Sequence, residues 1–249
     1  MINYRLYRTA RTVLPSGFIQ RVASSPFLRP IRDAVLRPAG TAAIVCGDVA
    51  WGGLSFSFAA PPAVLFRAQT RGVENRLCRL ARASLAEGDV AVDVGGNYGF
   101  VTIVLAHAVG PTGRVVVFEI DPSIAAVLQS NVDANRLTER VEVVACGAGA
   151  PDTSGTVTVD ERLGDRRVRF LMIDTDGHDL AVLHGAMCVI RRDRPIVVVE
   201  TNENGSAIYE LLTGLGYTHF IGMSNEAVVP GQWPHNMIAS TEPVAIPFD

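Results

Sequence analysis

An acidic residue followed by a glycine-rich turn carries the most definite chemistry in this chain. Residues 90–99 read V-A-V-D-V-G-G-N-Y-G, an apolar run that contains Asp93 and ends in glycines at positions 95, 96 and 99. Such a run is typical of a buried parallel strand that leads into a helix. The spacing differs from the G-x-G-x-x-G that places a pyrophosphate at a helix N-terminus, and a carboxylate two residues before the turn would repel phosphate. The turn therefore favours S-adenosylmethionine, which carries an ammonium and a sulfonium and no phosphate, over another nucleotide or a turn without a ligand.

A second acid follows the next apolar run, V-V-V-F, at the position of Glu119. Glu119 comes 26 residues after Asp93, which fits one βαβ unit, and an acid there can accept hydrogen bonds from both ribose hydroxyls of a bound nucleoside. NAD and S-adenosylmethionine sites share this feature, so it does not discriminate between them. The alternative interpretation is a surface turn in which Asp121 caps a helix that begins at Pro122.

Small residues follow the third apolar run, where Cys146 precedes Gly147. At the edge of a sheet they would leave room for an adenine ring, although such residues are also common in tight turns.

The densest polar cluster follows the fourth apolar run, at residues 174–179, D-T-D-G-H-D. Asp179 is partly explained as a helix N-cap. The fold does not require Asp174, Asp176 and His178, which could bind a divalent metal. Alternatively, His178 could supply a general base, or the segment could be a solvated loop. Glu200 ends the fifth run and should lie beside Asp174 if the two strands are neighbours, so that the pair could share a proton or orient a substrate hydroxyl.

The elements that must position these residues follow a repeating strand–helix pattern from residue 88 onward. This pattern predicts an α/β fold with a doubly wound, mostly parallel sheet, which binds ligands beyond the carboxyl ends of its strands. The tail, with strand-like pieces at 218–223 and 237–239, is expected to add an antiparallel hairpin. Ahead of the sheet we expect a strand pair at 41–66 and an amphipathic helix at 70–86. Glu74 could face the ligand site, but we interpret it as a solvated helix acid. The expected strands are 90–94, 115–119, 141–145, 168–173 and 195–200, and the expected helices are about 97–108, 122–135, 179–191 and 205–215.

The composition is that of a globular protein, with 48% hydrophobic and 19% charged residues, enough for a sizeable core. The net charge of −3 gives no indication of nucleic-acid binding. All 22 basic residues are arginines, which excludes Schiff-base chemistry and a P-loop lysine. The four cysteines are scattered and predict free thiols in a reducing cytoplasm rather than a disulfide or zinc role. No transmembrane helix or signal peptide is expected, and the sequence indicates no oligomeric state.

The N-terminal segment, residues 1–38, differs from the rest of the chain. It holds seven arginines against one acid, interleaved with apolar residues and interrupted by prolines. One hypothesis is a basic amphipathic arm that makes peripheral contact with an anionic membrane or a lipid-linked substrate. The other is a helical cap or a partly disordered tail.

Taken together, these motifs resemble the FkbM family of methyltransferases over residues 72–202. The family's V-D-V-G-A-N-x-G motif corresponds to residues 92–99, and its F-E-P-x-P motif corresponds to residues 118–122. The K-I-D-V-E-G-x-E motif corresponds to residues 172–179, and R-P-x-x-x-x-E corresponds to residues 194–200. Three departures affect the acceptor side: the two motif acids are Asp176 and Asp179, the opening lysine is Met172, and the segment at 147–165 is short.

The resemblance implies a class I, Rossmann-like methyltransferase domain at residues 41–249 behind a basic arm at residues 1–40. It also implies methyl transfer from S-adenosylmethionine to a hydroxyl of a sugar, glycan or secondary metabolite. The acceptor would be handled by Asp174, His178 and Glu200, with His178 as the base, and a metal held by Asp174, Asp176 and His178 is a possible variant that the resemblance does not require. The cofactor would be bound by Asp93, Gly95, Gly96, Asn97, Tyr98, Glu119, Ile120, Cys146 and Gly147.

Two other functions compete with this hypothesis. A non-catalytic binding module would keep the fold and recruit a partner through the basic N-terminal arm. The acids at 174–179 argue against it, because a scaffold does not need them. A nicotinamide-dependent oxidoreductase is disfavoured by the glycine spacing and by Asp93.

Overall fold

A computed structural model describes residues 43–247, so the basic arm and its expected membrane contact lie outside the described residues. The chain divides into two compact units, one ending at Arg71 and the other beginning at Gly72. In the described part of the first unit, strands β1 (Val45–Trp51) and β2 (Leu54–Ala60) form an antiparallel hairpin through the glycines at 52 and 53. Helix α4 (Pro62–Arg71) follows, with proline in its first turn, where a missing N–H costs nothing.

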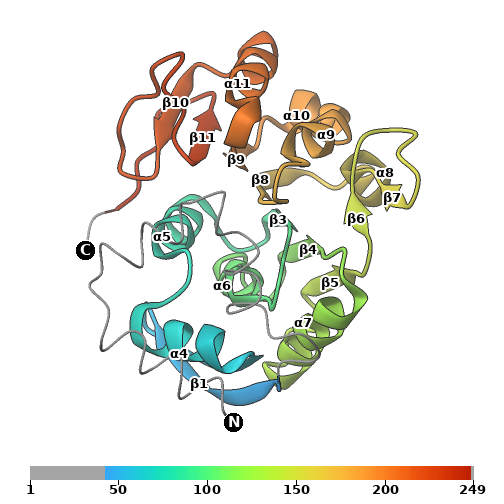
Figure 1. Cartoon of the computed structure of the whole chain (residues 1–249), viewed down its shortest axis with the longest axis vertical. Coiled ribbons are helices and arrows are strands. Elements are labelled where there is room, and N and C mark those ends of the chain that lie inside the picture. Colours follow the sequence, from blue (N-terminus) through green and yellow to red (C-terminus); the bar gives the residue numbers. More distant parts are fainter. Residues whose placement is uncertain (1–42, 248–249) are drawn as a thin grey trace, which may run out of the picture. The chain divides into compact units, whose positions relative to one another are not determined.

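The second unit is built on a seven-stranded sheet with the order β10-β11-β9-β8-β3-β4-β5 (Figure 1). Five of its strands run parallel, and β11 is antiparallel to both of its neighbours. The chain builds outward from β3 through β4 to β5, then returns to the other side of β3 as β8 and β9. The topological switch point therefore lies between β3 and β8. The strands are β3 (Val90–Val94), β4 (Arg114–Phe118), β5 (Val141–Val144), β8 (Val168–Ile173), β9 (Ile196–Glu200), β10 (His219–Gly222) and β11 (Asn236–Ser240).

Helices cover both faces of this sheet. Figure 1 shows α5 (Asn75–Ser84), α6 (Phe100–Ala108) and α7 (Pro122–Ala134) on one face. The other face carries α9 (Asp179–His184), α10 (Met187–Asp193) and α11 (Gly205–Gly214). Alternate strand residues such as Val92, Val94 and Phe118 are fully buried in one core with the second set of helices. This burial on both faces explains the nearly continuous apolar runs in the sequence.

Three further short elements lie between β5 and β8, and a 3-10 helix, η2 (Asn202–Asn204), precedes α11. Strands β6 (Gly147–Ala148) and β7 (Thr156–Val157) form a small parallel pair. Helix α8 (Val159–Leu163) begins with a capping box between Thr158 and Glu161. No helix among residues 43–247 combines the length and the hydrophobicity needed to cross a bilayer.

The expected architecture is confirmed, including the five parallel strands and the antiparallel C-terminal pair. The strand pair expected at 41–66 is present at 45–60, but residues 62–66 belong to α4. Two expectations about helices were wrong. The helix expected at 70–86 begins only at Asn75, and a separate α4 precedes it. The helix expected at 179–191 is two helices that are separated at Gly185, where the backbone packs so closely on Gly149 that a Cβ would lie 1.9 Å from the carbonyl oxygen of Gly149.

Candidate active site

The switch point brings the end of β3 against the end of β8. The amide of Asp174 donates to the carbonyl of Val94 at 2.9 Å. Gly95 has φ +93°, and a Cβ at this position would lie 1.9 Å from the carbonyl oxygen of Asp174. Only glycine satisfies both conditions. The close approach that this glycine permits is therefore to β8, and it fixes Asp174 beside the glycine turn.

The rest of the turn is also held by protein contacts. A Cβ at Gly96 would lie 2.2 Å from Cγ2 of Val117. Asn97 adopts the left-handed conformation with φ 50°, which asparagine tolerates better than most residues, and its Oδ1 accepts from the amide of Tyr98 at 2.9 Å. Asn131 on α7 donates to the carbonyl of Tyr98 at 2.8 Å. These contacts show that the turn is a rigid structure.

Glu119 ties the glycine turn to the end of β4. Its Oε2 accepts from the amide of Asn97 at 2.8 Å, and its Oε1 accepts from the amide of Asp121 at 2.9 Å. A carboxylate offers about four lone-pair positions, so this buried side chain retains acceptor capacity at the edge of the sheet. Asp121 caps α7 by accepting from the amides of Ser123 and Ile124, as the Asp-Pro pair predicts.

Asp93 lies below this surface, with only 2% of its area exposed. Its Oδ2 accepts from the hydroxyl of Thr102 on α6 at 2.6 Å. Burial raises the pKa of Asp93 to about 6, the Thr102 bond opposes the rise, and the charge of Glu119 adds to it. The structure thus places Asp93 in the interior between β3 and α6, where it supports the glycine turn from beneath.

Ile120 is an exposed apolar side chain at the sheet edge, with 68% of its area accessible. It lies over Gly147, where a Cβ would be 3.0 Å from its Cδ1. The neighbouring Cys146 thiol donates to the carbonyl of Gly155 at 3.4 Å. Ile120 therefore covers the buried Gly147 and presents an exposed apolar side chain next to Glu119.

Asp179 organises the polar loop after β8. It is 1% exposed, and its carboxylate accepts from the amide and hydroxyl of Thr175 and from the amide of Gly177, at 2.9–3.1 Å. Asp179 is the first residue of α9, and His178, without a side-chain capping bond, occupies the N-cap that the sequence assigned to Asp179. The loop turns through left-handed conformations at Asp176 and Gly177.

The metal variant at this loop is not supported. Asp176 and His178 are exposed, whereas Asp174 is mostly buried. Among residues 43–247 no three His, Cys, Asp or Glu side chains are gathered closely enough to hold a metal ion. The reason is that the loop closes on Asp179 through its own amides, which leaves Asp176 and His178 in solvent.

Asp174 lies among other acids at the carboxyl end of β8. Burial raises its pKa to about 7, and the negative charges of Glu200 and Glu74 add to the rise. Glu74 is thus not the solvated helix acid that the sequence suggested: it is the left-handed N-cap residue of α5 and acts on Asp174 electrostatically. The predicted proximity of Asp174 and Glu200 is present in the structure.

Glu200 lies at the end of β9, next to a residue that is not among the expected site residues. Its register partner on β11 is Asn236, and both side chains are buried. Glu200 Oε2 and Asn236 Oδ1 have no hydrogen-bond partner among the described residues. Two buried acceptors without a donor are costly, so this edge is suited to a group that donates hydrogen bonds. The only sequence signal for Asn236 is a polar residue at the start of the last apolar run.

His235 is a second residue at this edge that is not among the expected site residues. Its Nδ1 lies 3.3 Å from Oε1 of Glu200, while 77% of the imidazole side chain is exposed. The neighbouring Trp233 contacts Gly205 and lies 5.5 Å from the ring of Tyr209 on α11. The segment that precedes β11 is thereby anchored on α11, with His235 at the edge of the site.

Two family models match adjacent parts of the second unit. The model described as "Methyltransferase FkbM domain" matches residues 149–218. The model described as "Protein-L-isoaspartate(D-aspartate) O-methyltransferase" matches residues 73–153. The expected resemblance to the FkbM family is confirmed. The fold is that of the class I, Rossmann-like S-adenosylmethionine-dependent methyltransferases.

Curated relatives and solved structures agree with this fold. A catechol O-methyltransferase of Mycobacterium tuberculosis is 34% identical over 135 residues, which cover 54% of this chain and 57% of that protein. A tRNA (adenine-N(1))-methyltransferase of Methanocaldococcus jannaschii is 40% identical over 53 residues, which cover 21% of this chain and 19% of that protein. A solved complex of aTrm5 with tRNALeu has a TM-score of 0.51 at 13% identity and covers 81% of this chain and 53% of that one. The chain thus spans little more than half the length of the first relative.

Proposed function

We propose that the protein is an S-adenosylmethionine-dependent O-methyltransferase that acts on a small-molecule or glycan hydroxyl. The observation that carries this proposal is the acidic edge formed by Asp174, Glu200 and Asn236 next to the glycine turn. Its buried acceptors call for a donor, and a hydroxyl is such a donor. The catechol O-methyltransferase relative supports transfer to oxygen.

The residues around the glycine turn fit S-adenosylmethionine. Glu119 has acceptor capacity for ribose hydroxyls, and the exposed side chain of Ile120 offers an apolar surface for an adenine ring. The backbone of residues 95–98 would hold the methionine portion, with Cys146 beside the base, while the buried Asp93 would support the turn from the interior rather than contact the cofactor. When bound, the cofactor supplies an electrophilic methyl group on a sulfonium.

Asp174 is the general base in this proposal. An alcohol is a poor nucleophile until its proton is removed, and a base works best when its pKa is near the operating pH. The carboxylate of Asp174, with its pKa raised to about 7, would accept the hydroxyl proton. Glu200 would orient the hydroxyl, and His178 and His235 are alternative bases at the rim of the site.

The test is a transfer assay with methyl-labelled S-adenosylmethionine and a set of neutral, acidic and phenolic hydroxyl compounds. Label should appear in an acceptor as a methyl ether with the wild type and be lost with Asp174→Asn. Cofactor binding without transfer to any acceptor would instead favour the non-catalytic binding module.

A further inference from the structure

The carboxyl end of the sheet places one polar residue from each of three neighbouring strand positions in a row. Ile173 and Val199 form a register pair of β8 and β9, and Asp174 and Glu200 are the next residues on these strands. Glu200 is in turn the direct register partner of Asn236 on β11. Residues at equivalent positions of adjacent strands point to the same face of a sheet. The three polar side chains therefore form a row that starts at Asp174, beside the glycine turn.

Two members of this row are buried acceptors that lack a donor. Glu200 is 6% exposed and Asn236 is 8% exposed. Glu200 Oε2 and Asn236 Oδ1 accept no hydrogen bond from any residue between 43 and 247. Side chains directly opposite each other in an antiparallel pair have Cβ atoms about 5 Å apart, so one small group can reach both oxygens. Because a buried acceptor without a partner is costly, this pair is suited to a group that carries at least two donors.

The charges at this edge are negative. Among the residues that the structure describes, every charge that shifts the pKa of Asp174 comes from an acid and raises it. A cation bound beside Asp174 would be attracted by all of these charges, whereas a neutral hydroxyl would not. The acids are Glu200, Glu74, Asp179 and Asp176.

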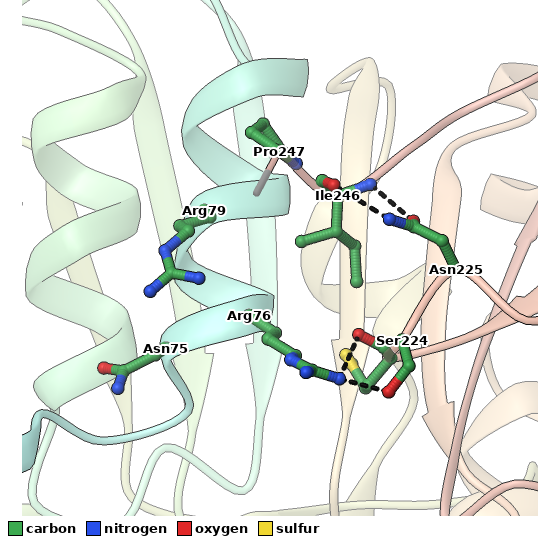
Figure 2. Close-up of a pocket in the computed structure, with 8 residues that line it drawn as sticks. Asn75, Arg76, Arg79, Ser224, Asn225, Ile246 and Pro247 are labelled. Atoms are coloured by element: carbon green, nitrogen blue, oxygen red, sulfur yellow. Dashed lines mark hydrogen bonds between the residues drawn. The ribbon is translucent and has the colours of Figure 1, made fainter. Parts of the chain in front are cut away.

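Two basic side chains close to these acids do not neutralise the free oxygen of Glu200. Arg76, in the first turn of α5, donates from Nη1 to the carbonyl of Met223 at 3.1 Å and to the hydroxyl of Ser224 (Figure 2). His235 is paired with the other oxygen of Glu200, Oε1, and 77% of its side chain is exposed, so that solvent screens the pair. Glu200 Oε2 is thus open to a further positive group.

A protonated amine meets both requirements of this pair. An ammonium group carries three N–H donors and a positive charge, whereas a hydroxyl carries one donor and can satisfy only one of the two oxygens. A hydrogen bond between an ammonium and a carboxylate is also about twice as strong as one between neutral groups. Charge and donor count therefore favour an amine over a second hydroxyl at Glu200 and Asn236.

We propose that Glu200 and Asn236 bind a protonated amine of the methyl acceptor, so that the acceptor is an amino alcohol such as an amino sugar. This inference rests on the proposed function and adds the substrate class. Asp174 takes the reacting hydroxyl, and the amine binds one strand further along the row, about 5 Å away, a separation that two substituents of one sugar ring can span. Glu200 thus orients the hydroxyl through the amine. The amine itself is not methylated, because an ammonium has no free electron pair.

The test is calorimetric titration of the full chain, saturated with S-adenosylhomocysteine, at about pH 6.5, where the amines are protonated. Two matched pairs of probes are used: glucosamine with glucose, and trans-4-aminocyclohexanol with trans-1,4-cyclohexanediol. In at least one pair the amine should bind ten times more tightly than the alcohol. N-acetylation of that amine, which removes its charge, should abolish the preference, and added salt should reduce it. No binding, or equal affinity within both pairs, would overturn the inference.

Single substitutions locate the amine. Glu200→Gln keeps the size of the side chain and removes its charge, and it should weaken binding of the amine at least tenfold. Asn236→Ala removes the second acceptor and should weaken it about threefold or more. Glu203→Gln, which changes an exposed acid three residues after Glu200, is the matched control and should have no effect. Unchanged affinity in both Glu200→Gln and Asn236→Ala would overturn the inference, and the probe pairs test it on the wild type if a variant does not fold.

The same samples separate this inference from the proposed function. S-adenosylhomocysteine is titrated first, and its binding without any preference for amines refutes the inference alone. A preference for amines in a protein that does not bind S-adenosylhomocysteine refutes the proposed cofactor alone. In the transfer assay, label on the oxygen of the amino alcohol supports both, whereas label on its nitrogen overturns both.

Discussion

Glu200 Oε1 lies 3.3 Å from Nδ1 of His235, a contact that joins the end of β9 to the residue preceding β11. The second oxygen of the same carboxylate is buried and has no hydrogen-bond partner within residues 43–247. The negative charge of Glu200 also acts on Asp174. Glu200 thus interacts both with the exposed imidazole of His235 and with the carboxyl group of Asp174. This relationship places three titratable groups from β8, β9 and β11 at a single edge of the sheet.

The pH dependence of turnover should follow Asp174. Because the base must be deprotonated, kcat should rise with pH and level off above an apparent pKa of about 7, the value to which burial raises this carboxyl group. Asp174→Asn should lower kcat by about 100-fold or more and abolish the rise of kcat with pH. Steady-state rates between pH 5 and pH 9 check this prediction. An unchanged profile in the variant would assign the base elsewhere.

The two histidines at the rim can be distinguished by single substitutions. No hydrogen bond or ion pair connects the His178 imidazole to another described residue, whereas His235 is paired with Glu200. We therefore expect His178→Ala to change kcat less than about threefold and His235→Ala to reduce it more, about tenfold. Rates at saturating cofactor give the comparison. A larger loss with His178→Ala would restore the original hypothesis that His178 is the base.

Gly95→Ala should strongly destabilise the fold. Its Cβ would lie 1.9 Å from the carbonyl oxygen of Asp174, in addition to the strain of φ +93°. We expect a loss of about 3 kcal/mol or more in the free energy of unfolding. Gly177→Ala is the matched control, since φ is +104° but no atom lies within 4 Å of the added Cβ, and the loss should be about 1–2 kcal/mol. Urea unfolding measures the loss of stability in both variants. Equal losses would contradict this prediction, because they would mean that the structure around Asp174 shifts to accept the added Cβ at no cost.

Asp93 should make folding stability depend on pH. Its pKa is about 6 in the folded state against 3.8 for an ordinary aspartate, so the folded state binds the proton more tightly than the unfolded state. Stability should therefore fall as pH rises from about 4 to about 6, by about 3 kcal/mol in total. In Asp93→Asn, whose side chain can still accept the hydrogen bond from Thr102, this decrease in stability between about pH 4 and pH 6 should be absent. Parallel pH profiles of unfolding for the two proteins would contradict the assignment.

The apolar runs predicted the sheet well, because strands buried on both faces leave a strong signal in sequence. Helix α4 was missed, because a strand pair was expected up to residue 66 although Pro62 begins a helix. The break at Gly185 depends on contact with Gly149, which is distant in sequence. At the site, adjacent parallel strands predicted the meeting of Asp174 and Glu200. Asn236 and His235 reach the same edge through an antiparallel register that no local pattern specifies.

The most direct test of the proposed cofactor is calorimetric titration with S-adenosylhomocysteine, with NAD in parallel. We expect micromolar binding of S-adenosylhomocysteine and no signal from NAD. Glu119→Ala, which removes the clamp on Asn97 and the acceptor for ribose hydroxyls, should weaken binding at least tenfold, while Glu139→Gln, an exposed acid after α7, should have no effect. Binding that survives Glu119→Ala unchanged, or no binding by the folded wild type, would contradict a cofactor site at this glycine turn.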